Sequence, residues 1–261
     1  MIVDALAFLG LHPLRGSGTE SPAELERALQ RAGIGRAYVA GLESLFRRNP
    51  WAANELHARR LASSSFLLPL AGVNPLYAVD RERLERLLEL GFKGLVLAPL
   101  YHGFSPRAAA VGRLLSWAAD LGVPVVLLCS IEDPRGSHRA YRFRYRVGER
   151  ELAGFLELAG RAGARVLISH AEFSLLEKLA RAIASADAVV DVTSNTVYGP
   201  VYDRVKALAE ELFGEDRVTL STGAPLNYPL IPILKVLYSD LDERARRKIL
   251  SENALRFYER K

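Results

Sequence analysis

The residues of this sequence best suited to chemistry are one histidine and two aspartates at expected β-strands. His170 ends one apolar run, Asp191 lies inside another, and Asp4 lies in the first strand. Histidine exchanges protons near neutral pH, and a buried carboxyl group with a raised pKa can do the same. These three side chains are our candidates for acid–base chemistry. Each also has a structural interpretation, in which the side chain only satisfies a neighbouring polar group.

Smaller polar groups at the ends of other expected strands could bind a ligand. This set comprises Tyr101 and His102 after the fourth strand, Thr193 and Asn195 after the seventh, and Ser221 and Thr222 after the eighth. Hydroxyl and amide groups suit an anion or a carbonyl group, although they satisfy loop backbone equally well. For the two aromatic residues we expect a packing role beside the ligand-binding one.

A stretch of alternating arginine and aromatic residues lies between residues 130 and 150. From Arg139 to Val147 the sequence reads RAYRFRYRV. In an extended segment, this period of two places guanidinium groups on one face and aromatic rings on the other. We interpret the stretch as a lid or an interface, with Arg139 and Arg142 available to an anionic small molecule. Single-stranded nucleic acid binds surfaces of similar composition, but the segment is short for that purpose, and nucleic acid is not the expected partner.

The elements that must position these residues are strands that alternate with helices. Strands are expected at Ile2–Leu9, Arg36–Ala40, Phe66–Val73, Gly94–Ala98, Val123–Cys129, Arg165–His170, Ala188–Thr193 and Val218–Ser221. Helices are expected at Ala23–Ala32, Trp51–Leu61, Asp80–Leu90, Ala108–Leu121, Glu151–Ala162, Ser174–Ser185, Val201–Phe213, Ile231–Tyr238 and Asp242–Tyr258. Alternation predicts a parallel sheet of the α/β class, and eight units favour a closed (β/α)8 TIM barrel over an open, doubly wound sheet.

The composition is that of a globular domain. The 261 residues, 49% hydrophobic and 25% charged, suit one barrel domain over residues 1–261, and the net charge of +5 mildly favours anionic ligands. The single cysteine, Cys129, excludes an internal disulfide and a cysteine-based zinc cluster. No apolar run reaches the ~18 residues of a membrane helix, and no signal peptide precedes the first strand, so we expect a cytoplasmic protein. Few labile residues and many charges suit a heat-adapted host.

Eight segments, taken in order, resemble the amidohydrolase superfamily in its amidohydrolase-2 branch of metal-dependent hydrolases and decarboxylases. They are VDALAFLG at 3–10, AGVNP at 71–75, GFKGLVLAP at 91–99, LGVPVVLL at 121–128, RVLISHA at 165–171, VVDVTS at 189–194, RVTLSTGAP at 217–225 and KILSENA at 248–254. Any one of them merely describes a buried strand or a helix. Their order, from the first strand to the last helix, carries the resemblance, which implies a TIM barrel of the metal-dependent hydrolase type.

The resemblance also implies where a metal site would lie. The family uses a divalent metal ion, usually zinc, that converts water into a nucleophile near neutral pH. The positions that match its ligands are Leu6 and Phe8, Val96 and Ala98, Leu128, and Gly223, while His170 matches an assisting histidine. A catalytic zinc ion needs about three side chains with nitrogen, oxygen or sulfur donors. We therefore expect neither a bound metal ion nor another cofactor.

These observations favour a pseudoenzyme, a binding or regulatory protein for a small, anionic or partly apolar molecule. One alternative is a metal-independent hydrolase or lyase that uses His170 as acid and base. Another is an ordinary metal-dependent hydrolase whose ligands lie elsewhere. The other histidines, His12, His57, His102 and His138, argue against that alternative because they fall in expected loops and helices. His12 and His57 are expected to face solvent or to cap a helix. Assembly into a homo-oligomer stays open.

Overall fold

The computed structural model describes residues 1–13, 16–77, 79–131, 147–193 and 201–260. Within them, one sheet has the strand order β2-β1-β3-β4-β5-β6-β7-β8-β9. All its strand pairs are parallel except β2, which runs antiparallel to the end of β1. The bounds are β1 Ile2–Leu11, β2 Gly18–Thr19, β3 Ile34–Gly41, β4 Leu67–Gly72, β5 Leu95–Leu97, β6 Val125–Leu128, β7 Val166–Ser169, β8 Ala188–Val192 and β9 Val218–Leu220.

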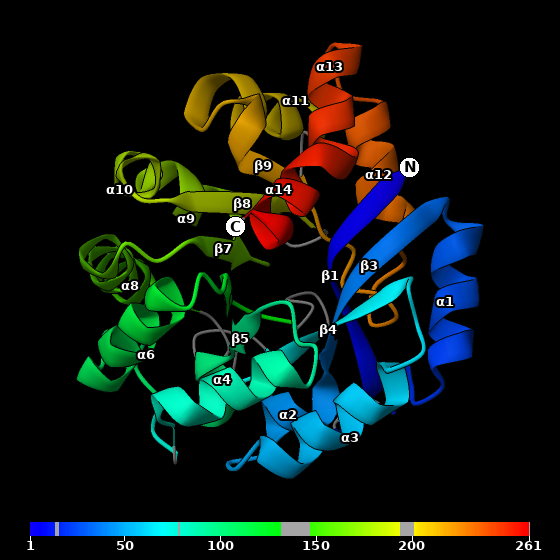
Figure 1. The fold of residues 1–261 in the computed structure, drawn as a ribbon. Helices are drawn as coiled ribbons and strands as arrows, with labels where there is room; N and C mark the ends of the chain where they lie inside the picture. Colours follow the sequence, from blue (N-terminus) through cyan, green and yellow to red (C-terminus); the bar gives the residue numbers. More distant parts are fainter. Residues whose placement is uncertain (14–15, 78, 132–146, 194–200, 261) are drawn as a thin grey trace.

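Helices surround this curled sheet (Figure 1). They are α1 Pro22–Arg31, α2 Leu42–Phe46, α3 Trp51–Leu61, α4 Arg81–Glu89, α5 Pro99–His102, α6 Ala109–Asp120, α8 Glu149–Ala162, α9 Phe173–Lys178, α10 Ala180–Ser185, α11 Val201–Lys206, α12 Leu230–Leu237, α13 Glu243–Arg247 and α14 Asn253–Glu259. Short π-helical turns follow α11 (η1, Ala207–Leu212) and α13 (η3, Lys248–Glu252), and a 3₁₀ turn (η2, Glu215–Arg217) precedes β9. In the described part of the chain, no helix is long and apolar enough to cross a membrane.

Local sequence signals explain how several helices begin and end. Ser21 accepts a hydrogen bond from the backbone N–H of Glu24 at the start of α1, and Asp80 caps α4 in the same way. Helix α8 ends at Gly163, whose φ of 65° glycine adopts without steric cost. All eight expected strands form. The expected helix Ser174–Ser185 is two helices, α9 and α10, and two short helices, α2 and α5, occupy segments expected to be loops.

The two ends of the sheet meet through the backbone of β1. Its pairing with β3 is irregular between Asp4 and Ala7, so backbone groups there are free to bond elsewhere. The carbonyl of Leu6 accepts a hydrogen bond from Gly223 N at 3.0 Å, and Phe8 N donates to the carbonyl of Ala224 at 2.7 Å. Because these partners follow β9, the parallel strands close into a barrel.

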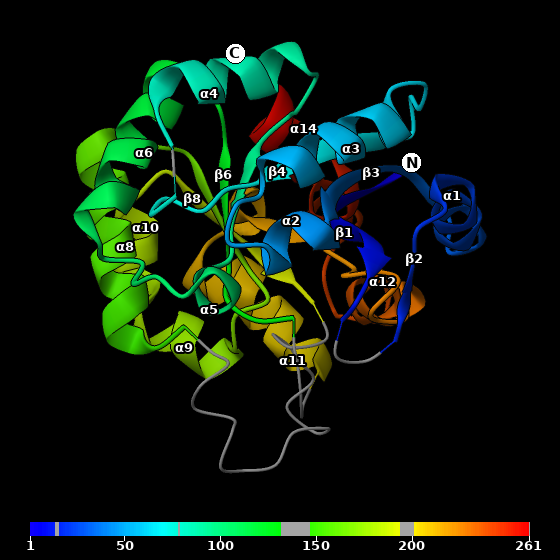
Figure 2. The same ribbon diagram turned by 90° about the horizontal axis from the view of Figure 1, so that it is seen from below.

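The interior of the barrel is an apolar core separate from the one beneath the helices. We call it the interior cluster; it includes Leu6, Phe8, Tyr38, Ala40, Leu70, Val96, Ala98, Val126, Leu128 and Leu167, all fully buried. Helix α14 closes one end, where Tyr258 stacks on Tyr38 with ring centroids 3.7 Å apart. Figure 2 shows α14 at that end, whereas α5, α9 and α11, which follow strands β5, β7 and β8, lie toward the other.

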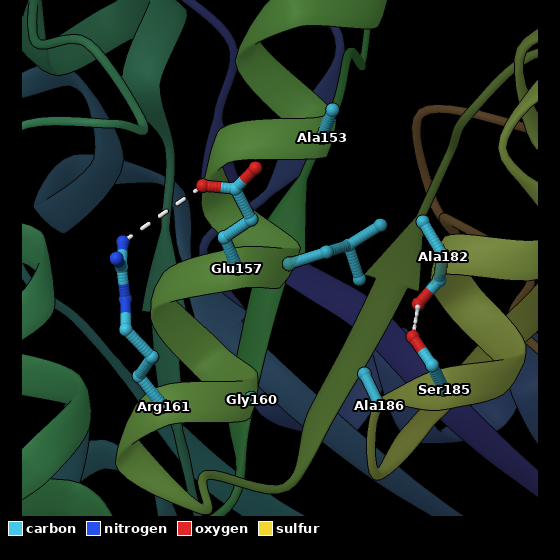
Figure 3. A pocket seen from close by; sticks show the side chains of 8 residues that line it. Ala153, Glu157, Gly160, Arg161, Ala182, Ser185 and Ala186 are labelled. Atoms are coloured by element: carbon cyan, nitrogen blue, oxygen red, sulfur yellow. Dashed lines mark hydrogen bonds and ion pairs between the residues drawn. The ribbon is translucent and has the colours of Figure 1, made fainter.

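A groove of about 390 Å³ lies outside the barrel, between α8 and α10 (Figure 3). Most of its lining residues are small, such as Ala153, Gly160 and Ala182, so the two helices leave space between them. Arg161 and Glu157 face each other along one side at 3.9 Å. The groove is therefore a consequence of small residues in the helical layer and is separate from the barrel interior.

Replacing Tyr258 with phenylalanine tests how α14 is tied to the barrel. The Tyr258 hydroxyl donates to the carbonyl of Ala5 at 2.7 Å, in the irregular part of β1. The variant leaves this buried carbonyl without its donor, so we expect a loss of about 1–3 kcal/mol in the free energy of unfolding. Chemical denaturation measures it. Tyr77→Phe removes a hydroxyl from an exposed ring and should change stability by less than about 0.5 kcal/mol; equal losses in both variants would contradict the assignment.

Candidate functional site

His170 leaves β7 in a strained backbone conformation. Its φ is 56°, and it is the one non-glycine residue with a positive φ in the described part of the chain. Its backbone N–H donates to Asp191 Oδ1 at 3.1 Å, which holds the turn. Such a conformation costs roughly 1–3 kcal/mol and recurs where a side chain must point at a functional site. Here it directs the imidazole into the barrel, where the side chain is buried.

Asp191, Ser169 and His170 form a chain of hydrogen bonds. The Ser169 hydroxyl donates to Asp191 Oδ2 at 2.5 Å and lies 2.8 Å from His170 Nδ1. A hydroxyl has one proton, so when Ser169 donates its hydrogen bond to a deprotonated Asp191, the imidazole must donate to Ser169 from Nδ1–H. Nε2 then carries no proton and has a free lone pair. If Asp191 is protonated instead, it donates to Ser169, Ser169 donates to Nδ1, and Nε2 carries the proton.

Burial sets the charge of this chain. It lowers the pKa of His170 to about 3, so the imidazole is neutral at pH 7. Burial raises the pKa of Asp191 to about 7, although the hydrogen bond from Ser169 lowers it. The Ser221 hydroxyl also lowers this pKa but does not reach hydrogen-bond geometry. Near neutral pH the hydrogen-bonded groups Asp191, Ser169 and His170 therefore exist in both proton arrangements.

The far side of the imidazole is unused. Among the described residues, His170 Nε2 is buried and has no hydrogen-bond partner. The Phe8 ring lies 6.0 Å from the imidazole ring, and Gly223 is so close that a Cβ on it would stand 2.6 Å from Nε2. An unsatisfied buried nitrogen is costly, and Nε2 is the ring atom of His170 that the described residues leave without a partner.

Asp4 binds the turn that follows β9. Its Oδ1 accepts hydrogen bonds from Thr222 N at 2.9 Å and from Leu6 N at 3.1 Å, and its Oδ2 accepts one from the Thr222 hydroxyl. Burial raises the pKa of Asp4 to about 7; the bonds from Thr222 and Leu6 lower it, and the nearby charge of Asp191 raises it. Asp4 and Thr222 thus lie beside the hydrogen-bonded groups Asp191, Ser169 and His170, but their own polar atoms already bond to each other and to nearby backbone.

The positions that the resemblance matched to metal ligands hold no donor atoms. Leu6, Phe8, Val96, Ala98 and Leu128 are fully buried together in the interior cluster. The sixth is Gly223, with a φ of 65°. In the described part of the chain, no three His, Cys, Asp or Glu side chains are grouped to hold a metal ion. These residues do not fit a catalytic divalent ion, which needs about three protein ligands.

The remaining candidate residues are dispersed. Tyr101 and His102 lie on α5; the Tyr101 hydroxyl accepts from Ile131 N at 3.3 Å, and His102 Nε2 lies 2.9 Å from the carbonyl of Ser44. Thr193 is buried directly after β8. The residues Arg139, Arg142 and Asn195 lie outside the described ranges, as does His138.

Two histidines that were expected to face solvent or to cap a helix are buried, so the prediction that they face solvent was wrong. His57 is on the inner side of α3, with Nε2 2.8 Å from the carbonyl of Val39, and burial lowers its pKa to about 4. His12 packs its ring edge-on against Phe46. Sequence reasoning also missed Ser169, although a serine directly before a strand-ending histidine was visible.

Comparison with known proteins agrees with this architecture. The amidohydrolase family model Amidohydro_2 matches residues 18–260. A 2,6-dihydroxybenzoate decarboxylase from Rhizobium superposes with a TM-score of 0.71 at 16% identity, over 99% of this chain and 98% of that one. A 5-carboxyvanillate decarboxylase from Sphingomonas paucimobilis gives 0.74 at 11% identity, over 99% and 98%. No curated protein matches.

A third similar structure contains a metal ion. It is a dihydroxybenzoic acid decarboxylase from a Polaromonas species with bound manganese and the inhibitor 2-nitroresorcinol, with a TM-score of 0.71 at 14% identity, over 99% of this chain and 96% of that one. At such identities the likeness concerns the fold. The (β/α)8 TIM barrel expected from the sequence is thereby confirmed.

Asp4→Asn tests the raised pKa of the buried carboxyl group. The folded protein holds this proton with a pKa of about 7, against an ordinary value of 3.8. Between these values the folded state binds more protons than the unfolded one, so this contribution to stability is complete below about pH 4 and is lost as pH rises through about 7. It amounts to an order of 4 kcal/mol.

The asparagine is isosteric and can donate to the Thr222 hydroxyl where Oδ2 accepts. We expect the free energy of unfolding of the wild-type protein to fall relative to that of Asp4→Asn as pH rises from 4 to 7. Denaturant titrations across this range measure the difference. A constant difference between the two proteins would show that Asp4 is not a titrating group.

Gly223→Ala tests the close approach of the turn to His170. The new Cβ would lie 2.6 Å from Nε2, and the residue has a positive φ. Gly103→Ala is the matched control, because Gly103 has a φ of 71° and no atom within 4 Å of such a Cβ. The control should lose about 1–2 kcal/mol of stability from its backbone alone, and Gly223→Ala about 1–3 kcal/mol more from overpacking. Thermal or chemical unfolding of both variants decides; equal losses would refute the contact.

Proposed function

Because the chain belongs to the amidohydrolase family, we propose that it is a member that works without the family's divalent metal ion, as a binding or regulatory protein for a small molecule. One observation carries the proposal. The six positions that match metal ligands offer alkyl groups, a phenyl ring and a glycine, and the five side chains among them are buried in one cluster.

The way these residues pack supports replacement of a metal site as a whole. Full burial of a large apolar side chain contributes about 1.5–3 kcal/mol to stability, so Leu6, Phe8 and Leu128 together stabilise the fold where metal ligands would not. A single histidine restored at one of these positions would place a polar ring in an apolar cluster, which costs stability unless the ring is hydrogen-bonded. At the positions where other members of the family would coordinate a metal ion, this barrel thus has side chains that pack against one another.

The atoms that remain indicate what kind of molecule would bind. His170 Nε2 accepts a hydrogen bond in one proton arrangement of the chain and donates one in the other, and its surroundings, Phe8 and the interior cluster, are apolar. We therefore propose a partly apolar ligand with a hydroxyl, amide or carbonyl group. If the ligand carries an anionic group, a cationic side chain from another part of the protein would have to bind that group. Arg139 and Arg142 are the candidates that the sequence offers.

Metal analysis tests this proposal first. We expect protein purified without chelator to contain substoichiometric zinc, manganese and iron, and its melting temperature not to change with chelator or with added metal ions. One metal ion bound per chain would contradict the proposal. A thermal-shift screen of aromatic acids and phenols then tests binding. A compound that stabilises the wild type should not stabilise His170→Ala, whereas Arg86→Ala, on the exposed face of α4, should respond as the wild type does.

The hydrogen-bonded chain favours a second candidate, acid–base catalysis without a metal ion. As Nε2 takes a proton from a substrate, Nδ1 can pass its proton to Ser169 and Ser169 its own to Asp191, so the imidazole never becomes charged. Reversal of these transfers returns the proton. Chemistry of this type suits a hydrolase or lyase.

Ser169→Ala separates the two candidates. It interrupts the proton path but leaves the imidazole in place, so a catalyst should lose about 10²–10⁴-fold in kcat with little change in KM. A binding protein should keep its ligand affinity. Turnover by wild-type protein that His170→Ala leaves unaltered would exclude the catalytic candidate.

A further inference from the structure

The residues of α12 are apolar on both sides of the helix. Pro232, Ile233 and Val236 are buried against the barrel. The opposite side is exposed and continues onto neighbouring residues. We call it the α12 face; it consists of Tyr202, Tyr228, Leu230, Ile231, Leu234, Leu237 and Tyr238. Lys235 is the one polar residue of α12. A helix that is hydrophobic on nearly every side is normally buried on nearly every side, yet here the rest of the described chain covers only one side of α12.

The α12 face is large and continuous. Tyr228 and Tyr238, at its two ends, are 80% and 67% exposed. Tyr202 on α11 lies beside Tyr238, with ring centroids 6.4 Å apart. With about 150–250 Å² per large side chain, the exposed fractions of the seven residues amount to roughly 550–900 Å² of surface. The largest apolar patch of a typical monomer is about 300–600 Å², so this face indicates a partner.

We propose that the partner is a second copy of this chain, packed on the α12 face about a two-fold axis. About 800 Å² per partner is what a stable protein interface buries. A two-fold interface brings the same surface into contact with itself, and none of the seven residues is charged, so no like charges oppose each other within the face itself. The pair would bury Leu234, at the centre of the face, against its own copy.

The charges around the face favour a protein partner over a lipid surface. The nearest charged residues in the sequence are three acidic and three basic: Asp203, Asp240 and Asp242, and Arg204, Lys206 and Lys235. Two of the basic groups are engaged, Arg204 over the ring of Phe173 and Lys206 with Glu210. A helix that binds a membrane surface has a polar side rich in lysine and arginine. This balanced rim suits contact between two proteins.

The mass of the full chain in solution tests the proposal. Light scattering at micromolar concentration should give about twice the 28.8 kDa of one chain. Leu234→Glu should give the single-chain mass with an unchanged circular dichroism spectrum. Leu76→Glu, which changes a side chain that is 57% exposed outside the face, should keep the doubled mass. A wild-type protein of single-chain mass overturns the proposal; if that monomer floats with phosphatidylglycerol vesicles, the occupant is a membrane.

A cross-link tests the geometry without disturbing the fold. The natural cysteine, Cys129, is buried, so only an introduced cysteine can be oxidised between chains. Leu234→Cys should form a disulfide-linked dimer in mild oxidant, because each Leu234 faces its counterpart at the axis, whereas Leu76→Cys should not. A doubled mass with no cross-link at position 234 would place the interface elsewhere and overturn the proposal.

Discussion

The carboxyl group of Asp4 joins the two ends of the sheet through hydrogen bonds, and the rest of the site depends on them. It accepts hydrogen bonds from the backbone and hydroxyl of Thr222, while the neighbouring Leu6 accepts from Gly223. The turn after β9 is therefore fixed against β1. Because that turn contains Gly223, the same contacts set how closely the backbone approaches His170 Nε2.

The interior combines a buried apolar cluster with one short series of hydrogen-bonded polar groups, Asp191, Ser169 and His170. Burial has opposite consequences for the two kinds of titratable group: it raises the pKa of Asp4 and Asp191 and lowers that of His170. The imidazole thus stays neutral, and near neutral pH each carboxyl group is protonated part of the time. A metal site requires several deprotonated ligands, such as carboxylates and neutral imidazoles, around one point. The cluster and the polar chain together favour a neutral ligand group at Nε2.

Much of the fold could be predicted from the sequence because it follows from local patterns. Ser21 and Asp80 cap helices as their types suggest, and runs such as Val125–Leu128 are strands covered on both faces. The short helix α5 was missed because four residues give no helical period. The burial of His57 could not be predicted either, because it depends on the tertiary partner that its ring finds, the carbonyl of Val39.

The candidate site was predictable in its residues but not in its connections. His170, Asp191, Asp4 and Thr222 were singled out as strand-end polar groups, and the structure brings them together in the barrel. The link through Ser169 could not be predicted, because it depends on the unusual backbone of His170, which brings Nδ1 within 2.8 Å of the serine hydroxyl. Nor could a sequence show that Gly223 lies against Nε2, since 53 positions separate the two residues.

The most direct test of a metal-free site is anomalous X-ray diffraction from crystals soaked with zinc and measured at the zinc absorption edge. The account predicts no anomalous peak within bonding distance of His170 Nε2, because no three His, Cys, Asp or Glu side chains of the described residues are grouped to hold a metal ion. A full-occupancy peak at this nitrogen, bonded to two or more other side chains, would contradict it.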